Sequence, residues 1–342
     1  MVARQAVLIT GAAGEIGHSL IEHFASENLF QIVALDLQKI PSSPSAPKDF
    51  VSIAGDITNK DLIGDIFEKY NIAQVFHLAG ILSSGGEKNP ARTHYVNVEG
   101  SMNIITAAKA YSQKSKARIK VIFPSTIAVY GIPSLDEKNR AGRITEDRYT
   151  LPVTMYGINK LYVENIGRYY ATSYKLLDQD PNDIKIDFRA IRFPGLMSAE
   201  TMPTGGTSDY ASEMIHACAQ NKPYTCFVSP SAKIPFMAMP DGIKALIELS
   251  QAPAEQLTQL TYNVGAFAVT AEEIRQQLSK TFPDAAAAVT YESNIPREGI
   301  VNTWPADVDD SKAANDWGWK PSYSFESAFE EYLIPNIRKK YQ

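Results

Sequence analysis

The sequence predicts an α/β protein built on a doubly wound parallel sheet with helices on both faces and a smaller C-terminal lobe. Short apolar runs rich in β-branched residues alternate with amphipathic helical stretches through the first half of the chain. A glycine-rich segment at residues 11–17 joins the first run to the first helical stretch. After residue 193 the elements become shorter and a Pro- and Gly-rich segment intervenes, which indicates the second lobe.

The alternating pattern predicts the elements of the first domain in order. Strands buried on both faces read as short, nearly continuous apolar runs, and we expect them at residues 7–10, 32–36, 50–54, 75–78, 120–124 and 186–193. We expect helices at residues 15–25, 60–70, 90–111 and 155–173. Because strands and helices alternate, the connections are βαβ units and the sheet is parallel.

The second half predicts a helix at 208–219, strand segments at 236–239 and 261–264, and a helix at 270–281. Thr270 followed by Glu273 is a capping box for the last of these. We therefore assign residues 1–193 and about 235–265 to the first domain. Residues 194–234 and 266–342 form the smaller lobe. The polar segments 41–47 and 175–185 are expected to be surface loops.

The composition of the chain limits the kinds of function that the protein can have. The chain has 342 residues, 44% hydrophobic and 21% charged, with a net charge of −5. These values are typical of a globular protein and exclude a surface made for nucleic acid or anionic membranes. The sequence runs into its first strand at once, which favours the cytoplasm, or a mitochondrion if a transit segment has been removed. Cys218 and Cys226 with His216 lack a fourth metal ligand, so we expect buried thiols and no metal site.

Gly11, Gly14 and Gly17 lie between the first strand and the first helix, where a phosphate-binding turn is expected. Gly11 permits the tight turn, Gly14 lets the backbone approach a pyrophosphate, and Gly17 lets the helix pack closely on the sheet. The N–H groups at the helix start then face the phosphates. An ordinary strand–helix turn is the alternative, but the position favours a Rossmann-type dinucleotide site.

Asp36 ends the second predicted strand, about twenty residues after the glycines. A carboxylate there accepts hydrogen bonds from both ribose hydroxyls and repels a 2′-phosphate, so it favours NAD over NADP. Lys39 is close enough to leave NADP open, and a strand-end cap is the alternative for Asp36. Asp56 and Ile57 follow the third strand and are candidates for contact with adenine.

Tyr156 and Lys160 are separated by one helical turn, so their side chains lie on the same helix face. A phenol titrates near ~10, and a neighbouring ammonium favours its phenolate. The pair is therefore suited to remove a proton from an alcohol. The same spacing also arises by chance on surface helices, so the surrounding residues decide its meaning.

Those surroundings resemble the extended short-chain dehydrogenase/reductase family over almost the whole chain. The resemblance rests on five features in the expected order: the glycine pattern, His77-Leu-Ala-Gly80, Asn97, the segment 124–131, and the Tyr156–Lys160 pair, with Trp317-Gly-Trp-Lys-Pro321 typical of the second lobe. The family implies Tyr156 as the base, Lys160 as the anchor of the nicotinamide ribose and a hydroxyl residue on the substrate oxygen. Thr126 matches that hydroxyl residue, and Ser125 adjoins it.

The same resemblance implies the cofactor contacts. The candidates that it adds to the glycines and to the residues named above are Glu15, Ile16, Leu78, Ala79, Gly80, Asn97 and Phe193. The family also implies a homodimer, formed through the helices at 90–111 and 155–173.

Within the family, the chain resembles most the group of L-threonine 3-dehydrogenases of the short-chain type. The segments that carry this likeness are 81–90, 192–198, 203–211 and 302–305. They imply L-threonine as the small-molecule substrate, with Ser83, Thr207 and Trp304 around it. A loop cap, a helix N-cap and a core aromatic are the respective alternatives. Phe193, Ala128-Val-Tyr130 and the 175–185 insertion depart from the group's pattern.

Two other functions remain open. A nucleotide-sugar epimerase or dehydratase uses the same Tyr and Lys. Ile127 and Ala128, however, stand where a dehydratase has an acidic pair, and residues 194–211 contain no Arg or Lys to hold a pyrophosphate. A cofactor-sensing regulator without activity need not keep Thr126, Tyr156 and Lys160 together.

Overall fold

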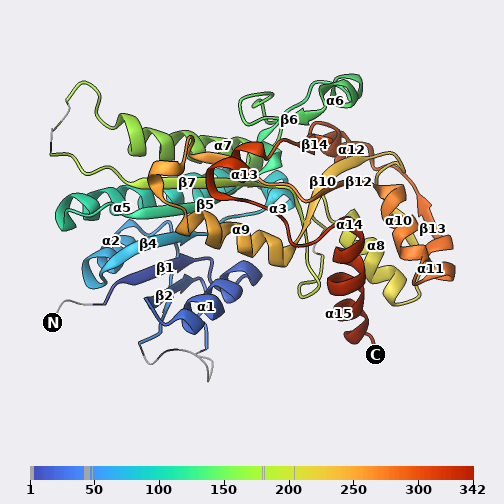
Figure 1. Ribbon diagram of the computed structural model, residues 1–342, viewed down its shortest axis with the longest axis horizontal. Helices are drawn as coiled ribbons and strands as arrows, with labels where there is room; N and C mark the ends of the chain where they lie inside the picture. Colours follow the sequence, from blue (N-terminus) through green and yellow to red (C-terminus); the bar gives the residue numbers. More distant parts are fainter. Residues whose placement is uncertain (1–3, 42–46, 48, 179, 181, 204) are drawn as a thin grey trace. The chain divides into compact units, whose positions relative to one another are not determined.

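The computed structural model describes residues 4–41, 47, 49–178, 180, 182–203 and 205–342 (Figure 1). Most of the loop expected at 41–47 lies outside these residues. The chain divides into two compact units. Unit 1 contains residues 1–125, 159–191 and 249–261, and unit 2 contains residues 126–158, 192–248 and 262–342.

Unit 1 is built on a seven-stranded sheet whose strand order is β11-β7-β5-β4-β1-β2-β3. The strands are β1 (Ala6–Thr10), β2 (Gln31–Asp36), β3 (Val51–Ala54), β4 (Ile72–His77), β5 (Lys120–Thr126), β7 (Asp187–Phe193) and β11 (Thr261–Asn263). β1 pairs in parallel with β2 and with β4, and all five of its residues are fully buried. The strand order reverses direction at β1, as in a Rossmann-type fold, so the predicted fold class is confirmed.

Helices cover both faces of this sheet. α2 (Lys60–Lys69) and α5 (Gly100–Ser115) lie side by side (Figure 1), and they share one apolar core with Val75 of β4 and Val163 of α7 (Met155–Arg168). Successive strand residues point to opposite faces. Phe76 therefore faces the other side, where its ring lies 5.4 Å from that of Phe24 on α1 (Glu15–Glu27).

Two of the predicted helices contain a π-helical stretch. The helix expected at 90–111 consists of α4 (Pro90–His94), the π-turn η1 (Tyr95–Glu99) and α5. α7 continues into a second π-turn, η3 (Tyr169–Ser173). Such turns occur often at functional sites. In η1 the widened turn contains the buried Asn97, one of the predicted cofactor residues.

The described residues of unit 2 form three small sheets. They are β12 (Phe267–Thr270), β10 (Lys233–Ala238) and β8 (Gly195–Met197); β13 (Val289–Tyr291) with β9 (Tyr224–Cys226); and β14 (Asp307–Val308) with β6 (Arg143–Ile144). α8 (Tyr210–Ala219) packs against α10 (Ala271–Ser279), α11 (Pro283–Ala287) and α15 (Ile334–Lys339). The capping box of Thr270 and Glu273 opens α10. The other helices of unit 2 among the described residues are η2 (Ile127–Val129), α6 (Leu135–Ala141), α9 (Met239–Gln251, whose last three residues group with unit 1), α12 (Ile295–Asn302), α13 (Ser311–Trp317), α14 (Phe325–Ser327) and η5 (Ala328–Leu333). Unit 1 also contains the short helices α3 (Ser83–Lys88) and η4 (Ala254–Gln256).

The two units divide the chain differently from the predicted domains. Residues 126–158 and 235–248 were expected in the dinucleotide-binding domain, but they group with unit 2. Unit 2 consequently spans as many residues as unit 1, although the sequence led us to expect a smaller lobe. The segment 126–158 is tied to unit 2 by contacts of β6 with β14, which no local sequence pattern announces.

Candidate active site

The glycine-rich turn has the geometry expected of a phosphate-binding loop. Gly11 has φ +68°, and a Cβ there would lie 2.7 Å from the Ala79 backbone nitrogen. A Cβ on Gly17 would lie 2.6 Å from the carbonyl oxygen of Ala12, so its neighbour is the loop rather than a strand. A Cβ on Gly14 would approach only Gly11, at 3.4 Å. Gly11 and Gly17 thus serve the packing of the turn, whereas Gly14 leaves open space at the start of α1.

Asp36 joins the end of β2 to this turn. Its Oδ2 accepts a hydrogen bond from the Ala13 backbone N–H at 3.0 Å. The carboxylate is thereby held beside the glycine loop, where the sequence predicts the adenosine ribose. The neighbouring Glu15 and Ile16 form the first turn of α1.

Asp56 and Ile57 follow β3. Asp56 Oδ1 accepts hydrogen bonds from both the backbone N–H and the hydroxyl of Thr58, at 2.9 and 2.8 Å. The Ile57 side chain is buried against α5, since a Cβ on Gly100 would lie 2.4 Å from its Cδ1. Contact of these two residues with adenine stays a prediction.

Asn97 supports the segment after β4 that contains Leu78, Ala79 and Gly80. Its amide forms two hydrogen bonds with the Ile81 backbone: Oδ1 accepts from the N–H at 2.7 Å, and Nδ2 donates to the carbonyl at 2.9 Å. A Cβ on Gly80 would lie 3.1 Å from Asn97 Oδ1. Gly80 therefore permits Asn97 to fix the course of this segment.

His77 lies at the end of β4 and connects three elements. Its Nδ1 lies 2.8 Å from Thr10 Oγ1 on β1, and its Nε2 lies 2.9 Å from Ser101 Oγ on α5. Burial, together with the charge of Lys160, lowers the pKa of His77 to about 3. The imidazole is consequently neutral and structural, a role that the motif alone did not indicate.

Lys160 is buried and held by β5. Its ammonium donates a hydrogen bond to the Pro124 carbonyl oxygen at 2.6 Å and lies 4.4 Å from the centre of the Phe123 ring. Burial lowers the pKa of Lys160 to about 7, while the negative charge of Glu164 acts in the opposite direction. The ammonium thus has a fixed position and a proton that is held less tightly than in water.

Ser125 and Glu164 form a buried pair next to this lysine. The Ser125 hydroxyl donates a hydrogen bond to Glu164 Oε1, and both residues are almost fully buried. The hydroxyl of Ser125 is therefore directed at Glu164. Our sequence reasoning missed Glu164, although its spacing of four residues from Lys160 places it on the same helix face.

In unit 2, Thr126 is hydrogen-bonded to the hydroxyl of Tyr156. Thr126 Oγ1 also accepts from the Ala128 backbone N–H at 3.1 Å, which fixes its rotamer at the start of η2. Burial raises the pKa of Tyr156 to about 12, and the hydrogen bond with Thr126 acts in the opposite direction. The hydroxyl of Thr126 is thus directed at the phenol.

Close packing between backbone segments brings Thr126 and Tyr156 together. A Cβ on Gly157 would lie 2.0 Å from the Ala128 carbonyl oxygen, and one on Gly131 would lie 1.8 Å from the Leu151 carbonyl oxygen. Side chains at either position would push the start of α7 away from η2. The glycine after Tyr156 is thus a sequence signal for the contact between Tyr156 and Thr126.

The candidate substrate residues are distributed over both units. Ser83, the first residue of α3, belongs to unit 1, whereas Thr207, Trp304 and the cofactor candidate Phe193 belong to unit 2. Thr207 is buried and is not an N-cap, because α8 begins at Tyr210 after Asp209. Trp304 is 4% exposed, and its indole N–H has no hydrogen-bond partner among the described residues. A core aromatic normally satisfies that group, so Trp304 has a donor to offer.

Comparison with known proteins places these features in a family. Residues 7–265 match the NAD dependent epimerase/dehydratase family. This chain belongs to that family. The mitochondrial L-threonine 3-dehydrogenase of Bos taurus is 33% identical over 94% of this chain and 79% of its own length.

Solved structures of similar proteins agree with the assignment. The holo form of a GalE-like L-threonine dehydrogenase from Cupriavidus necator is 30% identical, with a TM-score of 0.82 over 97% of this chain and 99% of its own. A monomeric L-threonine 3-dehydrogenase from a metagenome is 32% identical, with a TM-score of 0.83 over 98% and 100%. The family resemblance inferred from the sequence is confirmed, and NAD is the cofactor of the family.

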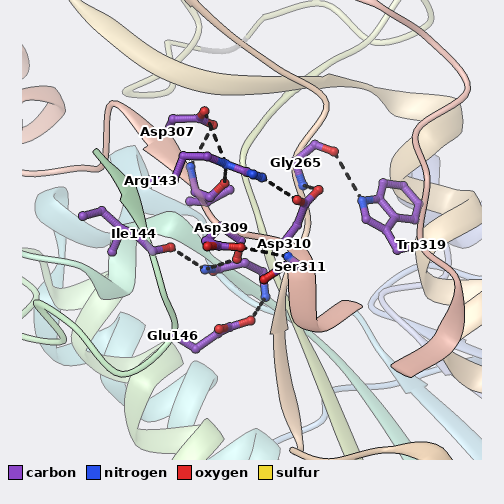
Figure 2. A network of polar contacts seen from close by, with 11 residues as sticks. Arg143, Ile144, Glu146, Gly265, Asp307, Asp309, Asp310, Ser311 and Trp319 are labelled. Carbon is purple, nitrogen blue, oxygen red and sulfur yellow. Dashed lines mark hydrogen bonds and ion pairs between the residues drawn. The ribbon is translucent and has the colours of Figure 1, made fainter. Parts of the chain in front are cut away.

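A buried polar network in unit 2 supports the turn that follows the candidate residue Thr126. The Asn263 side chain donates to the Ile144 and Asp309 carbonyl oxygens at 2.9 and 3.2 Å, and its Oδ1 accepts from the Tyr130 hydroxyl at 2.7 Å. Glu146 Oε1 accepts from the Asn263 backbone N–H at 2.9 Å (Figure 2). Tyr130 closes η2, which begins after Thr126. The network therefore holds the far end of the turn that positions Thr126.

The same network continues across β6 and β14. Arg143 donates to the Val308 carbonyl oxygen at 3.0 Å and to Asp310 Oδ1 at 2.5 Å, and Trp319 donates to the Gly265 carbonyl oxygen at 3.3 Å (Figure 2). These residues come from segments far apart in the sequence. No spacing rule could have grouped them. Our sequence analysis named only Trp319, within the motif at 317–321, and did not predict its partner.

Within the described ranges, no helix is both long and apolar enough to cross a membrane. The same residues contain no group of three or more His, Cys, Asp and Glu side chains arranged to hold a metal. Cys218 and Cys226 are buried free thiols, and His216 Nδ1 lies 2.8 Å from the Tyr341 hydroxyl.

Proposed function

We propose that this protein is an NAD-dependent L-threonine 3-dehydrogenase, which oxidises L-threonine at C3 to L-2-amino-3-oxobutanoate. The observation that carries the proposal is the hydrogen bond between Thr126 and Tyr156, with Lys160 one turn further along α7. Relatives over nearly the whole chain are named as L-threonine 3-dehydrogenases or L-threonine dehydrogenases.

Three side chains carry the proposed chemistry. Thr126 and Tyr156 hydrogen-bond the C3 hydroxyl, and Tyr156 accepts its proton as general base. The Lys160 ammonium favours the phenolate of Tyr156, because an opposite charge one helical turn away stabilises the ionised form. When bound, NAD supplies the hydride acceptor at C4 of the nicotinamide. The products are the ketone, NADH and one proton.

The residues of unit 1 fit a dinucleotide. The open space beside Gly14 leaves room for a pyrophosphate, and the first residues of α1 provide backbone N–H groups to bind it. Asp36 presents a carboxylate beside that loop for the ribose. The proposed cofactor contacts are Gly11, Gly14, Glu15, Ile16, Gly17, Asp36, Asp56, Ile57, Leu78, Ala79, Gly80, Asn97, Tyr156, Lys160 and Phe193.

The proposed substrate contacts are Ser83, Ser125, Thr126, Tyr156, Thr207 and Trp304. L-Threonine is small and zwitterionic, so it needs a few donors and acceptors in a compact site. The unpartnered indole N–H of Trp304 supplies one such donor. The contact of Ser125 with Glu164 favours Thr126 over Ser125 as the residue on the reacting hydroxyl.

The competing function is that of a nucleotide-sugar epimerase or dehydratase, because the matched family includes such enzymes. Absorbance of NADH separates the two: L-threonine should yield NADH in proportion to its consumption, whereas epimerisation of a UDP-sugar leaves the cofactor unchanged. Small β-hydroxy amino acids and UDP-sugars are assayed side by side. NADH formation with none of the amino acids would refute the proposed function.

We also propose that the protein is a homodimer and that it is located in the cytoplasm, with the mitochondrion as the alternative compartment. In unit 1, Tyr95, Tyr162 and Tyr169 expose 54%, 45% and 40% of their surface along the helices expected to pair. Sedimentation equilibrium at micromolar concentration tests the dimer. A monomer, the state given in the name of the metagenome relative, would refute it.

A further inference from the structure

Arg297 is located at the start of α12 and holds the glycine-rich segment before α8. Its Nη2 donates a hydrogen bond to the Gly206 carbonyl oxygen at 2.8 Å. Its guanidinium carbon lies 3.3 Å from the centre of the Phe227 ring. Stacking and hydrogen bonding together fix the planar guanidinium in one orientation.

Phe227 also contacts the other end of this segment. The Tyr210 ring, in the first residue of α8, meets Phe227 edge to face, with 5.8 Å between centroids and an interplanar angle of 86°. Gly206 is thus held by Arg297 and Tyr210 by Phe227. Thr207 lies between these two fixed points and is buried.

The turn itself is closed by Asp209. Its Oδ2 accepts from the Gly206 N–H at 2.6 Å, and the Asp209 N–H donates to the Gly206 carbonyl oxygen at 3.2 Å. The Gly206 carbonyl consequently accepts two hydrogen bonds, one from within the turn and one from Arg297. Without Arg297 the turn keeps its local bonds but loses its attachment to α12.

α12 also leads directly to Trp304. The Trp304 backbone N–H donates to the Val301 carbonyl oxygen in the last turn of α12, at 3.2 Å. One short helix therefore connects the anchor of the Thr207 segment to the buried indole whose N–H lacks a partner among the described residues. This connection links two candidate substrate residues that are nearly one hundred positions apart.

We propose that Arg297 is a positioning residue that sets the place of Thr207 for the substrate through the Gly206 carbonyl. The inference rests on the proposed function for the identity of that substrate. It assigns no contact between Arg297 and the substrate itself. The guanidinium of Arg297 binds the Gly206 carbonyl oxygen, and Thr207 is the residue that contacts the substrate.

Steady-state kinetics of Arg297→Met and Arg297→Lys test the proposal. A hydrogen bond from a charged donor contributes about 1.5–3 kcal/mol, so KM for L-threonine should rise about tenfold or more in Arg297→Met. Affinity for NADH should stay close to wild type, whereas the melting temperature should fall slightly, because the same hydrogen bond also stabilises the folded protein. Arg297→Lys keeps a charged donor but not the planar stack, and its KM should lie between the two.

Arg275→Met is the matched control, because Arg275 belongs to unit 2 and pairs with Glu272 on the same helix. It should leave KM unchanged. A wild-type KM in Arg297→Met would overturn the inference and leave the proposed function standing.

Hydrogen exchange separates the inference from the proposed function. The backbone amides of residues 206–208 should exchange faster in Arg297→Met than in the wild type, even if the enzyme does not oxidise L-threonine. Equal exchange would overturn the inference. Failure of the wild type to oxidise L-threonine would overturn only the proposed function.

Discussion

The hydroxyls of Thr126 and Tyr156 are hydrogen-bonded to each other in unit 2. Burial alone would keep Tyr156 protonated, since its pKa is raised to about 12. The hydrogen bond from Thr126 opposes that effect, and the ammonium of Lys160 on the same helix face is expected to do the same. We therefore propose two roles for Thr126: it holds the substrate oxygen, and its hydrogen bond makes the phenol of Tyr156 a better base.

Tyr156→Phe should lose at least about a hundredfold in kcat, because a positioned general base contributes about 10²–10⁴. Thr126→Ala should lose less, and Thr126→Ser should keep most of the activity because its hydroxyl makes the same hydrogen bond. NADH titration by fluorescence checks that the variants still bind the cofactor. A Tyr156→Phe enzyme with wild-type turnover would disprove the assignment of the base.

Glu164 should set the pH range in which Lys160 is charged. The carboxylate raises the pKa of Lys160 against the lowering caused by burial. In Glu164→Gln that support is lost, so Lys160 loses its proton at lower pH. The alkaline limb of kcat/KM against pH, which reports groups of the free enzyme, should move to lower pH. Glu68→Gln, at an exposed ion pair with Lys114, is the control and should not shift the profile.

Burial of Lys160 should also make the free energy of unfolding depend on pH. Its pKa in the folded state is about 7, below the ordinary value, so the unfolded state binds the proton more tightly. Between pH 7 and the ordinary lysine pKa of ~10.4, this group alone makes the free energy of unfolding rise with pH. Lys160→Met should lose that contribution. Urea unfolding at several pH values measures the slope difference, and equal slopes would contradict the buried charge.

Asp36 should decide between NAD and NADP. Asp36→Asn removes the negative charge that repels a 2′-phosphate and weakens the hydrogen bonds to the ribose hydroxyls. At about 1.5–3 kcal/mol for a charged hydrogen bond, kcat/KM for NAD should fall about tenfold to a hundredfold, while that for NADP rises. Asp61→Asn, exposed on α2, is the control. An unchanged preference for NAD over NADP would show that Asp36 supports the glycine loop through Ala13 but does not select the cofactor.

Two glycines of the glycine-rich turn should have separate roles, Gly14 in cofactor binding and Gly17 in folding. Gly14→Ala should fold normally, because its new Cβ would meet only the Gly11 carbonyl oxygen at 3.4 Å, yet it should weaken NAD binding by filling the space reserved for phosphate. Gly17→Ala should lower the melting temperature, because its Cβ would lie 2.6 Å from the Ala12 backbone. Calorimetry of both variants with and without NADH tests this contrast, and equal effects on stability would contradict it.

The sequence predicted what local patterns encode. The strand and helix periodicities, the glycine turn, Asp36 and the spacing of Tyr156 and Lys160 each depend on residues close together in the chain. The capping box of Thr270 and Glu273 is of the same kind. The structure also connects these features to distant segments, for example Lys160 to the Pro124 carbonyl oxygen, but their positions in the chain are set by local patterns.

Long-range contacts could not be predicted. The grouping of residues 126–158 with unit 2 follows from β6 pairing with β14, over one hundred and sixty residues away. Asn263 and Tyr130 meet through the fold alone. The sequence already favoured Thr126 over Ser125, but the hydrogen bond that the Ser125 hydroxyl donates to Glu164 could not be predicted from it. Geometry of this kind has no signature in spacing or composition.

Asn263 provides the last prediction, because it is fully buried and hydrogen-bonds the Tyr130 hydroxyl and the Ile144 and Asp309 carbonyls. Asn263→Ala would leave these groups without their partner at a cost of about 1–3 kcal/mol each, not fully additive. We expect the free energy of unfolding to fall by about 3–5 kcal/mol in urea.

Activity should fall as well, since Tyr130 closes the turn that begins after Thr126. Asn139→Ala, at an exposed position of α6 in unit 2, is the control and should cost nothing measurable. An Asn263→Ala protein as stable as the wild type would show that water replaces the amide in this network. Full activity in a destabilised variant would show that the network supports unit 2 without positioning Thr126.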